Sequence, residues 1–261
     1  MDLGLNNKRA LVIASYKGFG RGIAETLAAE GAELLLCGRD EAALQDAAKG
    51  IIDRGGRAKW TACDLSAPDF ANTMTAKAKA ELGGVDILVN NTGGPPPGTA
   101  QSITSDQIAT HAHTMVGSVI GLTNLLLPGM IAAGWGRVLT LTSSGVEQPI
   151  PNLALSNTLR AALVGWSKTL AAEVAIKGIT SNILIPGRIH TDRVDQLDAA
   201  AAGRQDKTVD AVRTASRASI PTGRYGKVEE FSSVAAFLCS DKAGYVNGAK
   251  IRCDGGAIRG V

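Results

Sequence analysis

A glycine-rich stretch near the N-terminus has the residue types and spacing needed to bind a phosphate. Residues 10–14 are an apolar run, which predicts a buried strand, and Ser-Tyr-Lys-Gly-Phe-Gly-Arg-Gly follows at 15–22. The apolar residues of the segment 20–30 recur at helical spacing. A strand, a glycine turn and a helix direct backbone N–H groups and the positive end of a helix at one point. The spacing of the glycines is not G-x-G-x-x-G. From this motif alone, a tight turn that binds no ligand is therefore an alternative interpretation.

A second apolar run, at 33–37, ends in Gly38-Arg39-Asp40. In a dinucleotide-binding fold, the residue at this strand end faces the adenosine ribose, where a carboxylate binds the 2′-hydroxyl and an arginine accommodates a 2′-phosphate. We therefore expect Arg39, with Lys17 in the glycine turn, to favour NADP(H). Asp40 is the alternative ribose ligand, although its place before a helix predicted over 41–54 also makes it a good N-cap.

Polar residues follow the next two predicted strands. Asp64-Leu65 follows a strand over 57–62, and Asn90-Asn91 follows a strand over 85–89. A helix predicted over 70–82 separates these strands, and such alternation indicates a parallel sheet, whose ligands bind at the carboxyl ends of the strands. Read singly, Asp64 could be a helix cap and the asparagines turn residues.

The composition is that of an ordinary globular protein: 261 residues, 45% hydrophobic, with a net charge of +3 and no basic run. From this composition, one large α/β domain over 1–261 is as plausible as two small ones, and nucleic-acid binding has no support. We find neither a signal peptide nor an apolar stretch near the length of a membrane span, which predicts a cytoplasmic protein. The four cysteines, Cys37, Cys63, Cys239 and Cys253, lack metal-ligand spacing, so we expect no metal site. Three of them lie in or beside predicted strands, which favours reduced core thiols.

Motifs along the chain together resemble the short-chain dehydrogenases/reductases, and the resemblance covers essentially the whole sequence. It rests on Gly18-Phe19-Gly20, Asp64-Leu65, Asn90-Asn91-Thr92-Gly93, Gly136-Arg137-Val138, Thr142-Ser143-Ser144, Pro186-Gly187-x-Ile189-x-Thr191 and Asp254-Gly255-Gly256. The resemblance implies an α/β single-domain Rossmann fold, a doubly wound seven-stranded parallel sheet with helices on both faces. It also implies an oxidoreductase that interconverts a carbonyl and a secondary alcohol, similar to the 3-oxoacyl reductases.

The remaining elements are predicted from apolar periodicity. They are a stiff loop at 95–98, a helix over 106–127 that ends near Pro128, a strand over 137–141, a helix over 159–175, a strand over 181–185, a helix over 228–240 and a strand over 250–252.

By resemblance, the cofactor contacts fall in the glycine turn, at the strand ends and in the loop after the sixth strand. This loop would hold the nicotinamide carboxamide through the backbone of Ile189 and the hydroxyl of Thr191. One departure is Ala14, which stands where the family has its first loop glycine. The expected cofactor residues are Ser15, Lys17, Gly18, Phe19, Gly20, Arg39, Asp64, Leu65, Asn91, Thr92, Gly93, Arg160, Pro186, Gly187, Ile189 and Thr191.

The catalytic residues depart further from the family. Ser143 matches the substrate-orienting serine, but Ser156 and Arg160 stand in place of the catalytic tyrosine and lysine, and Met115 in place of a relay asparagine. A phenol titrates near a pKa of about 10 and serves as a general acid, whereas an aliphatic hydroxyl needs a partner base. Arg160 retains the positive charge. We assign Ser143, Ser156 and Arg160 as the catalytic set.

The proton donor stays open, with water or a histidine as candidates. His190 lies in the loop after the sixth strand, and His111 lies one helical turn before Met115. Both are more often structural or solvent-facing residues in such positions.

Residues 191–220 match the family's substrate-covering lid. Arg188 and Arg193, with Arg160, suggest an anionic substrate. The alternative is that Arg160 only replaces the lysine and the other two solvate a loop. The resemblance also implies a homotetramer or homodimer. Two functions follow: an NADP(H)-dependent oxidoreductase with a non-standard proton donor, or a non-catalytic NADP(H)-binding sensor or scaffold of the same fold.

Overall fold

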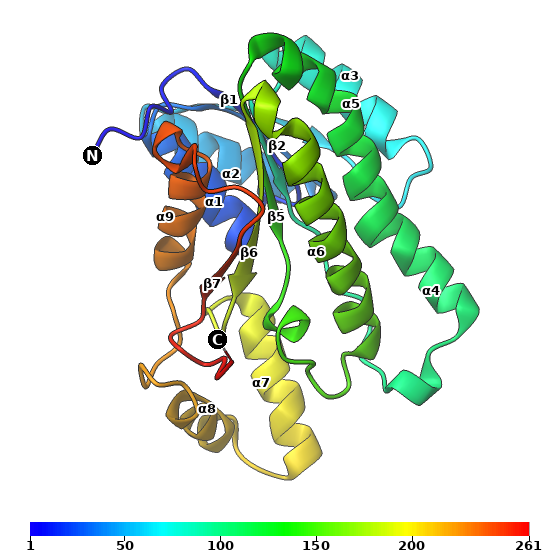
Figure 1. Ribbon diagram of the computed structural model, residues 1–261. Helices are drawn as coiled ribbons and strands as arrows, with labels where there is room; N and C mark the ends of the chain where they lie inside the picture. The colour runs from blue at the N-terminus through cyan, green and yellow to red at the C-terminus, as the bar shows by residue number, and fades with distance from the viewer. Residues whose placement is uncertain (261) are drawn as a thin grey trace.

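Seven parallel strands form the sheet at the centre of the molecule, in the order β3-β2-β1-β4-β5-β6-β7 (Figure 1). They are seen in a computed structural model that describes residues 1–260. This confirms the predicted doubly wound sheet of seven strands. The strands are β1 Arg9–Val12, β2 Glu33–Gly38, β3 Arg57–Ala62, β4 Ile87–Asn90, β5 Gly136–Leu141, β6 Ile179–Pro186 and β7 Lys250–Cys253.

The central strands are apolar because both of their faces are covered. Every residue of β5 and β6 is buried, whereas β3, at one edge, has only half-buried and exposed residues. The chain order reverses between β1 and β4. In open parallel sheets, the crevice for a ligand lies at such a reversal, beyond the carboxyl ends of the strands.

Helices cover both faces of the sheet and enclose two apolar cores (Figure 1). On one face lie α1 Gly18–Ala29, α2 Glu41–Asp53 and α9 Val228–Leu238. On the other lie α3 Phe70–Leu82, α4 Ser105–Ala112, α5 Ser118–Ala133 and α6 Ala154–Val174. Short helical turns lie between these elements: η1 Ala100–Ser102, η2 His113–Gly117, η3 Ser144–Val146, η4 Ala175–Lys177 and η5 Asp241–Ala243.

The helix expected to end near Pro128 continues to Ala133, so that prediction is wrong. Proline removes the N–H that would bond to the carbonyl four residues earlier. Both Pro128 and Asn124 lie on the exposed side of α5, where water can bind the freed carbonyl. The helix tolerates the proline for this reason.

Helices α4, η2 and α5 run on as one helical segment over Ser105–Ala133, with a π-helical turn at η2. With 29 residues and a mean hydropathy of 1.7 in its most apolar window, it is long and apolar enough to cross a membrane. The expectation of no such segment is therefore wrong. Core helices of globular proteins meet the same criterion, and 39% of this window is buried inside the molecule, partly against α3.

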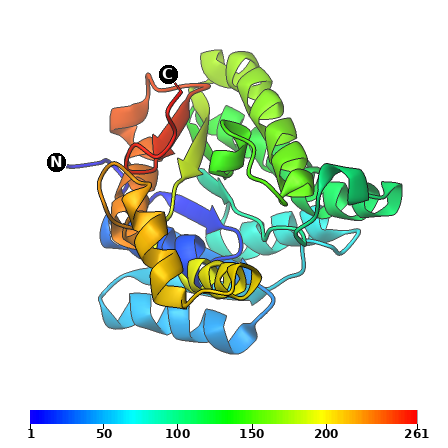
Figure 2. The same cartoon turned by 90° about the horizontal axis from the view of Figure 1, so that it is seen from below.

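The predicted lid region contains two helices, α7 Asp192–Gln205 and α8 Val209–Ala218. In Figure 1 they form the yellow and gold end of the molecule, beside the tip of β6, and Figure 2 views the molecule from that end. They lie where the carboxyl ends of the strands meet.

The four cysteines are free, as predicted, with Cys37 and Cys239 buried in the core. Burial raises the pKa of the Cys239 thiol to about 12. Within residues 1–260, no three His, Cys, Asp or Glu side chains are grouped so that they could hold a metal ion.

Candidate cofactor and active site

The glycine turn presents the open N-terminus of α1. Lys17 is the N-cap residue, but no side chain caps the helix there, so the first N–H groups are available to an anion. A Cβ at Gly20 would lie 2.3 Å from the carbonyl oxygen of Ala14, so only glycine lets the turn close this tightly. This backbone is suited to a phosphate.

Ala14 adopts a backbone conformation that favours glycine, the residue that the similar family has at this position. Its φ is +50°, in the left-handed region that costs an alanine roughly 1 kcal/mol or more. Asn91, at the end of β4, donates from Nδ2 to the carbonyl oxygen of Ala14 at 3.2 Å. The departure therefore strains the turn without closing it.

Two predicted cofactor residues turn their side chains away from the crevice. The hydroxyl of Ser15 accepts from the backbone N–H of Cys37 at 2.9 Å and so joins the turn to β2. The ring of Phe19 packs on that of Phe231, with centroids 4.5 Å apart. Only the backbones of Ser15 and Phe19 are left to contact a cofactor.

Arg39 and Lys17 stand exposed at the predicted adenosine end, and neither side chain has a hydrogen-bond or ion-pair partner within residues 1–260. The ring of Tyr16 lies over Gly38, where an added Cβ would come within 2.5 Å of it. The Nζ of Lys17 is 5.3 Å from the centre of this ring. Sequence reasoning had not assigned Tyr16 to the site.

Asp40 is the N-cap of α2 and accepts from the N–H of Ala43 at 3.0 Å, which favours the cap over the ribose ligand. Asp64 accepts from the N–H of Ser66 at 2.9 Å and from its hydroxyl at 2.8 Å. These two bonds hold the pKa of Asp64 below its usual value, and the bond from the backbone N–H has the larger effect. Its neighbour Leu65 accepts from the hydroxyl of Ser118.

Arg160 is buried between the ends of β4 and β5. It donates to the carbonyl oxygens of Leu141 and Thr92, at 3.2 Å each, and has no carboxylate partner within residues 1–260. Burial lowers the pKa of its guanidinium to about 10, so the group stays charged at neutral pH. Since a guanidinium has five N–H donors, three are left for a ligand.

Buried hydroxyls beside Arg160 also lack partners. Among residues 1–260, Thr92 Oγ1 and Thr142 Oγ1 are buried without a hydrogen bond, although such atoms are normally satisfied. Gly93 and Gly94 open onto free space, since an added Cβ would meet nothing within 4 Å. The threonine hydroxyls without partners, beside the open backbone of Gly93 and Gly94, are suited to hydrogen bonds with the ribose and carboxamide of a nicotinamide. Sequence reasoning missed Thr142, which a buried threonine at a strand end could have suggested.

Ser143 follows β5 and is half-buried. Its Oγ accepts from the N–H of Gly145 at 3.1 Å, so its hydroxyl proton stays free to donate to a substrate oxygen. Asn157 packs over Gly145, because an added Cβ there would come within 2.2 Å of Asn157 Oδ1. Ser156 is buried in the first turn of α6 and makes no side-chain hydrogen bond within residues 1–260.

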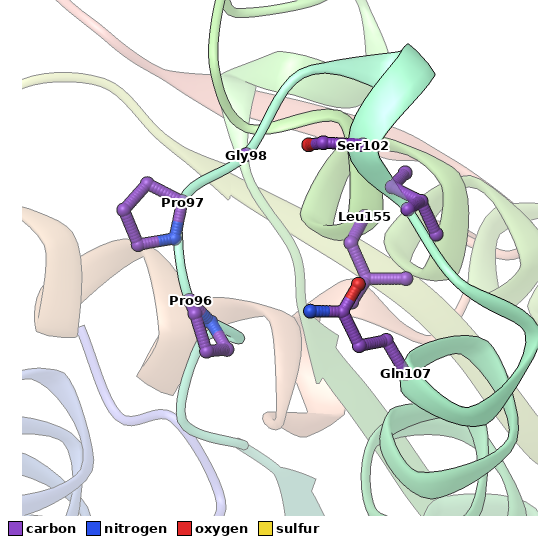
Figure 3. A pocket seen from close by; sticks show the side chains of 7 residues that line it. Pro96, Pro97, Gly98, Ser102, Gln107 and Leu155 are labelled. Atoms are coloured by element: carbon purple, nitrogen blue, oxygen red, sulfur yellow. The ribbon is translucent and has the colours of Figure 1, made fainter.

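The place of the relay asparagine is apolar. Met115 is buried against Leu155 and Leu159 of α6. Leu155 also lines a pocket of about 40 Å³ with Pro96, Pro97, Gly98, Ser102, Ile103 and Gln107 (Figure 3). Met115, Leu155 and Leu159 themselves offer no polar side chain to a proton relay.

The loop after β6 faces the glycine turn. A Cβ at Gly18 would lie 4.0 Å from Cγ2 of Thr191, the N-cap of α7. No hydrogen bond from the Thr191 side chain caps α7, and Ile189 is buried in the core. A Cβ at Gly187 would meet Asp254 at 2.5 Å. The predicted carboxamide loop is thus beside the turn.

The two predicted substrate arginines differ in their surroundings. Arg188 Nη1 pairs with the buried Oδ1 of Asp198 at 2.6 Å, and Arg193 is exposed on α7. The Nε2 of His190 lies 3.3 Å from Oδ1 of Asp195, and its ring is exposed. His111 is half-buried on α4. Asp198 was missed because a single acidic residue in a polar helix gives no sequence signal.

Comparisons with known proteins agree with this geometry. A family model described as "Enoyl-(Acyl carrier protein) reductase" matches residues 13–257. The 3-oxoacyl-[acyl-carrier-protein] reductase FabG of Salmonella typhimurium is 34% identical over 257 residues, covering 97% of this chain and 98% of that protein. The D-beta-hydroxybutyrate dehydrogenase of Cupriavidus necator is 33% identical over 266 residues, covering 97% of this chain and 99% of that protein.

Solved structures are similarly close. The L-sorbose reductase of Gluconobacter frateurii, complexed with NADPH and L-sorbose, has a TM-score of 0.94 at 30% identity and covers all of both chains. YwfH, an NADPH-dependent reductase involved in bacilysin biosynthesis, has a TM-score of 0.94 at 25% identity, over 98% of this chain and 100% of that one.

The chain belongs to the short-chain dehydrogenase/reductase family. The predicted class, an NADP(H)-dependent oxidoreductase that interconverts carbonyls and alcohols, is confirmed by these comparisons.

Proposed function

We propose that this chain reduces a carbonyl of a small molecule with NADPH, and that Ser143, Ser156 and Arg160 act as its catalytic set in the absence of the family's tyrosine and lysine. The observation that carries this is the buried, charged Arg160, which is fixed by the carbonyl oxygens at the ends of β4 and β5. One of these, that of Leu141, is two residues before Ser143. NADPH, when bound, supplies the hydride, which is the chemistry of the cofactor itself.

The protein's own part is to orient the carbonyl and stabilise charge. The hydroxyl of Ser143, whose proton has no other acceptor within residues 1–260, donates a hydrogen bond to the substrate oxygen. The fixed charge of Arg160 stabilises the negative charge that develops on that oxygen, and in a buried site this needs no reorganisation of water. Because its pKa is about 10, Arg160 does not release the proton at neutral pH, and water or a histidine supplies it.

The substrate resembles a 3-oxoacyl compound in our proposal, since the curated relatives include 3-oxoacyl-[acyl-carrier-protein] reductases. An anionic group on it is supported by the net charge of +3 and by exposed Arg193, not by Arg188. We further propose a cytoplasmic homodimer or homotetramer. Exposed Leu125 and Ile131 on α5 support a subunit contact.

Turnover tests the proposal. NADPH absorbance is followed with a panel of ketones and 3-oxoacyl thioesters, for the wild type and for Ser143→Ala, with exposed Ser233→Ala on α9 as control. We expect turnover by the wild type and the control and a loss of about 10²-fold or more in Ser143→Ala, because one oxyanion donor is worth that much. Tight NADPH binding with no turnover across the panel would instead support the alternative, a non-catalytic sensor or scaffold.

A further inference from the structure

Asp198 is buried in the middle of the lid. It lies on α7, has 0% exposure, and no other Asp or Glu of residues 1–260 is as deeply buried. A buried carboxylate is costly unless other groups satisfy it. Its partners therefore indicate what it is for.

Those partners come from three different segments. Oδ1 of Asp198 accepts from Nη1 of Arg188 at 2.6 Å, and Oδ2 accepts from the hydroxyl of Tyr225 at 3.0 Å. Nε of Arg213, on α8, lies 3.5 Å from Oδ2. We call Asp198, Arg188, Tyr225 and Arg213 the lid latch. It joins α7 to the loop after β6, to α8 and to the segment before α9.

The latch acts on the backbone of the loop. Arg188 and His190 pair with Gly226, the residue after Tyr225: the N–H of Gly226 donates to the carbonyl oxygen of Arg188, and the N–H of His190 to that of Gly226, each at 2.9 Å. Ile189 and Gly226 form an isolated β-bridge. Arg188 and Tyr225, which both bond to Asp198, directly precede these two residues in the chain.

The same loop is anchored to the sheet at its other end. The N–H of Gly187 donates to the carbonyl oxygen of Cys253, at the end of β7, at 2.9 Å. Between this anchor and α7 lie Ile189 and Thr191, and Thr191 faces Gly18 of the glycine turn. The latch therefore fixes the part of the loop nearest the crevice.

We propose that Asp198 is a positioning residue, which holds Arg188 and Tyr225 so that the loop 186–191 stays shaped for the nicotinamide half of the cofactor. This rests on the proposed function for the identity of the cofactor. This role explains why Arg188 pairs with Asp198 and not with a substrate. Loss of Asp198 should not affect binding of the adenosine half of the cofactor, which we place near Lys17 and Arg39.

Two ligands separate the halves. NADPH and 2′,5′-ADP, which lacks the nicotinamide, are titrated by calorimetry into the wild type, Asp198→Asn, Tyr225→Phe and the control Asp210→Asn, which removes an exposed carboxylate of α8. We expect the Kd for NADPH to rise at least tenfold in Asp198→Asn and about threefold in Tyr225→Phe, with that for 2′,5′-ADP unchanged in both. Equal affinities for NADPH in all four proteins, or a parallel loss for both ligands, would overturn the proposal.

Hydrogen exchange tests the latch without a ligand. In Asp198→Asn, the amides of 187–205 should exchange at least tenfold faster than in the wild type, while those of β5 stay protected. Unchanged exchange in the loop would overturn the latch. If the wild type bound no NADPH, the proposed function would fail, and hydrogen exchange would still decide the latch. If Asp198→Asn did not fold, Tyr225→Phe, which removes only one hydroxyl, would decide both tests.

Discussion

Arg160 is the residue that most distinguishes this site from the family's usual tyrosine–lysine site. It is charged, buried and held by two carbonyl oxygens, to which its planar fork donates from two different nitrogens. Its pKa of about 10 leaves it charged at neutral pH and uncharged only in strong alkali. Activity that depends on this charge should therefore fall as the pH rises through about 10.

Restoring the family residues tests the role of α6. We expect Ser156→Tyr combined with Arg160→Lys to raise generic ketone reductase activity, because a phenol beside a cation is a better general acid than a serine hydroxyl. Initial rates with NADPH and simple ketones measure this. Each single substitution is the control. An unchanged rate would show that residues 156 and 160 do not occupy the catalytic positions.

Arg39 and Lys17 are predicted to read the 2′-phosphate. Removing either cation should weaken NADPH by roughly tenfold, about 1.4 kcal/mol, and leave NADH unchanged, since only NADPH carries that phosphate. Calorimetry of Arg39→Ala and Lys17→Ala gives both constants, with exposed Arg193→Ala as the control. Equal losses for the two cofactors would place these cations away from the phosphate.

At the scale of elements, α5 carries a feature that stability measurements can reach. Proline inside a helix costs up to about 3 kcal/mol relative to alanine, and Pro128 sits on the exposed side of α5. We expect Pro128→Ala to raise the free energy of unfolding by about 1 to 3 kcal/mol in denaturant titrations. Gly129→Ala, one residue on, separates this effect from general helix propensity. A loss of stability in Pro128→Ala would indicate that the proline packs against another subunit.

The elements themselves were largely predictable, since the strands are short apolar runs and the helices have clear periodicity. β3 and α3 have the predicted bounds, over 57–62 and 70–82. Pro128 misled the prediction because a proline ends a helix only where its freed carbonyl is left without water or another partner. Exposure of that carbonyl is a property of the fold and not of the local sequence.

At the site, sequence patterns located the backbone but not the side-chain partners. The glycine turn and the loop after β6 lie where the motifs place them. The pairing of Arg188 with Asp198 could not be predicted, because it joins a loop to a helix ten residues later through burial alone. The π-helical turn at Met115 and the partnerless Thr142 likewise depend on packing across elements.

At the scale of the whole molecule, one ion pair ties the sheet together at the end opposite the site. Asp86 accepts from Nε and Nη2 of Arg9 at 2.9 and 2.6 Å, and from the N–H of Arg9 at 2.9 Å. Burial opposes ionisation of Asp86, but the bonds from Arg9 prevail and lower its pKa. The pair links the start of β1 to the residue before β4.

This pair should make stability depend on acid. Because the folded pKa of Asp86 lies below its unfolded value near 3.9, its contribution is complete above about pH 4 and is lost as the pH falls through the folded pKa. Asp86→Asn should lower the free energy of unfolding by about 2 kcal/mol at pH 7 and by less below pH 3. Denaturant titrations at both pH values measure this, with exposed Asp69→Asn as control. A loss independent of pH would contradict it.

The central claim is that this molecule transfers a hydride from NADPH to a carbonyl carbon without the family's tyrosine and lysine. The most direct measurement uses NADPH deuterated at C4 of the dihydronicotinamide, with the carbonyl panel, and mass spectrometry of the product. The account predicts an alcohol with one added deuterium on the former carbonyl carbon, lost in Ser143→Ala. Consumption of NADPH with no deuterium in any product, or no consumption at all, would contradict it.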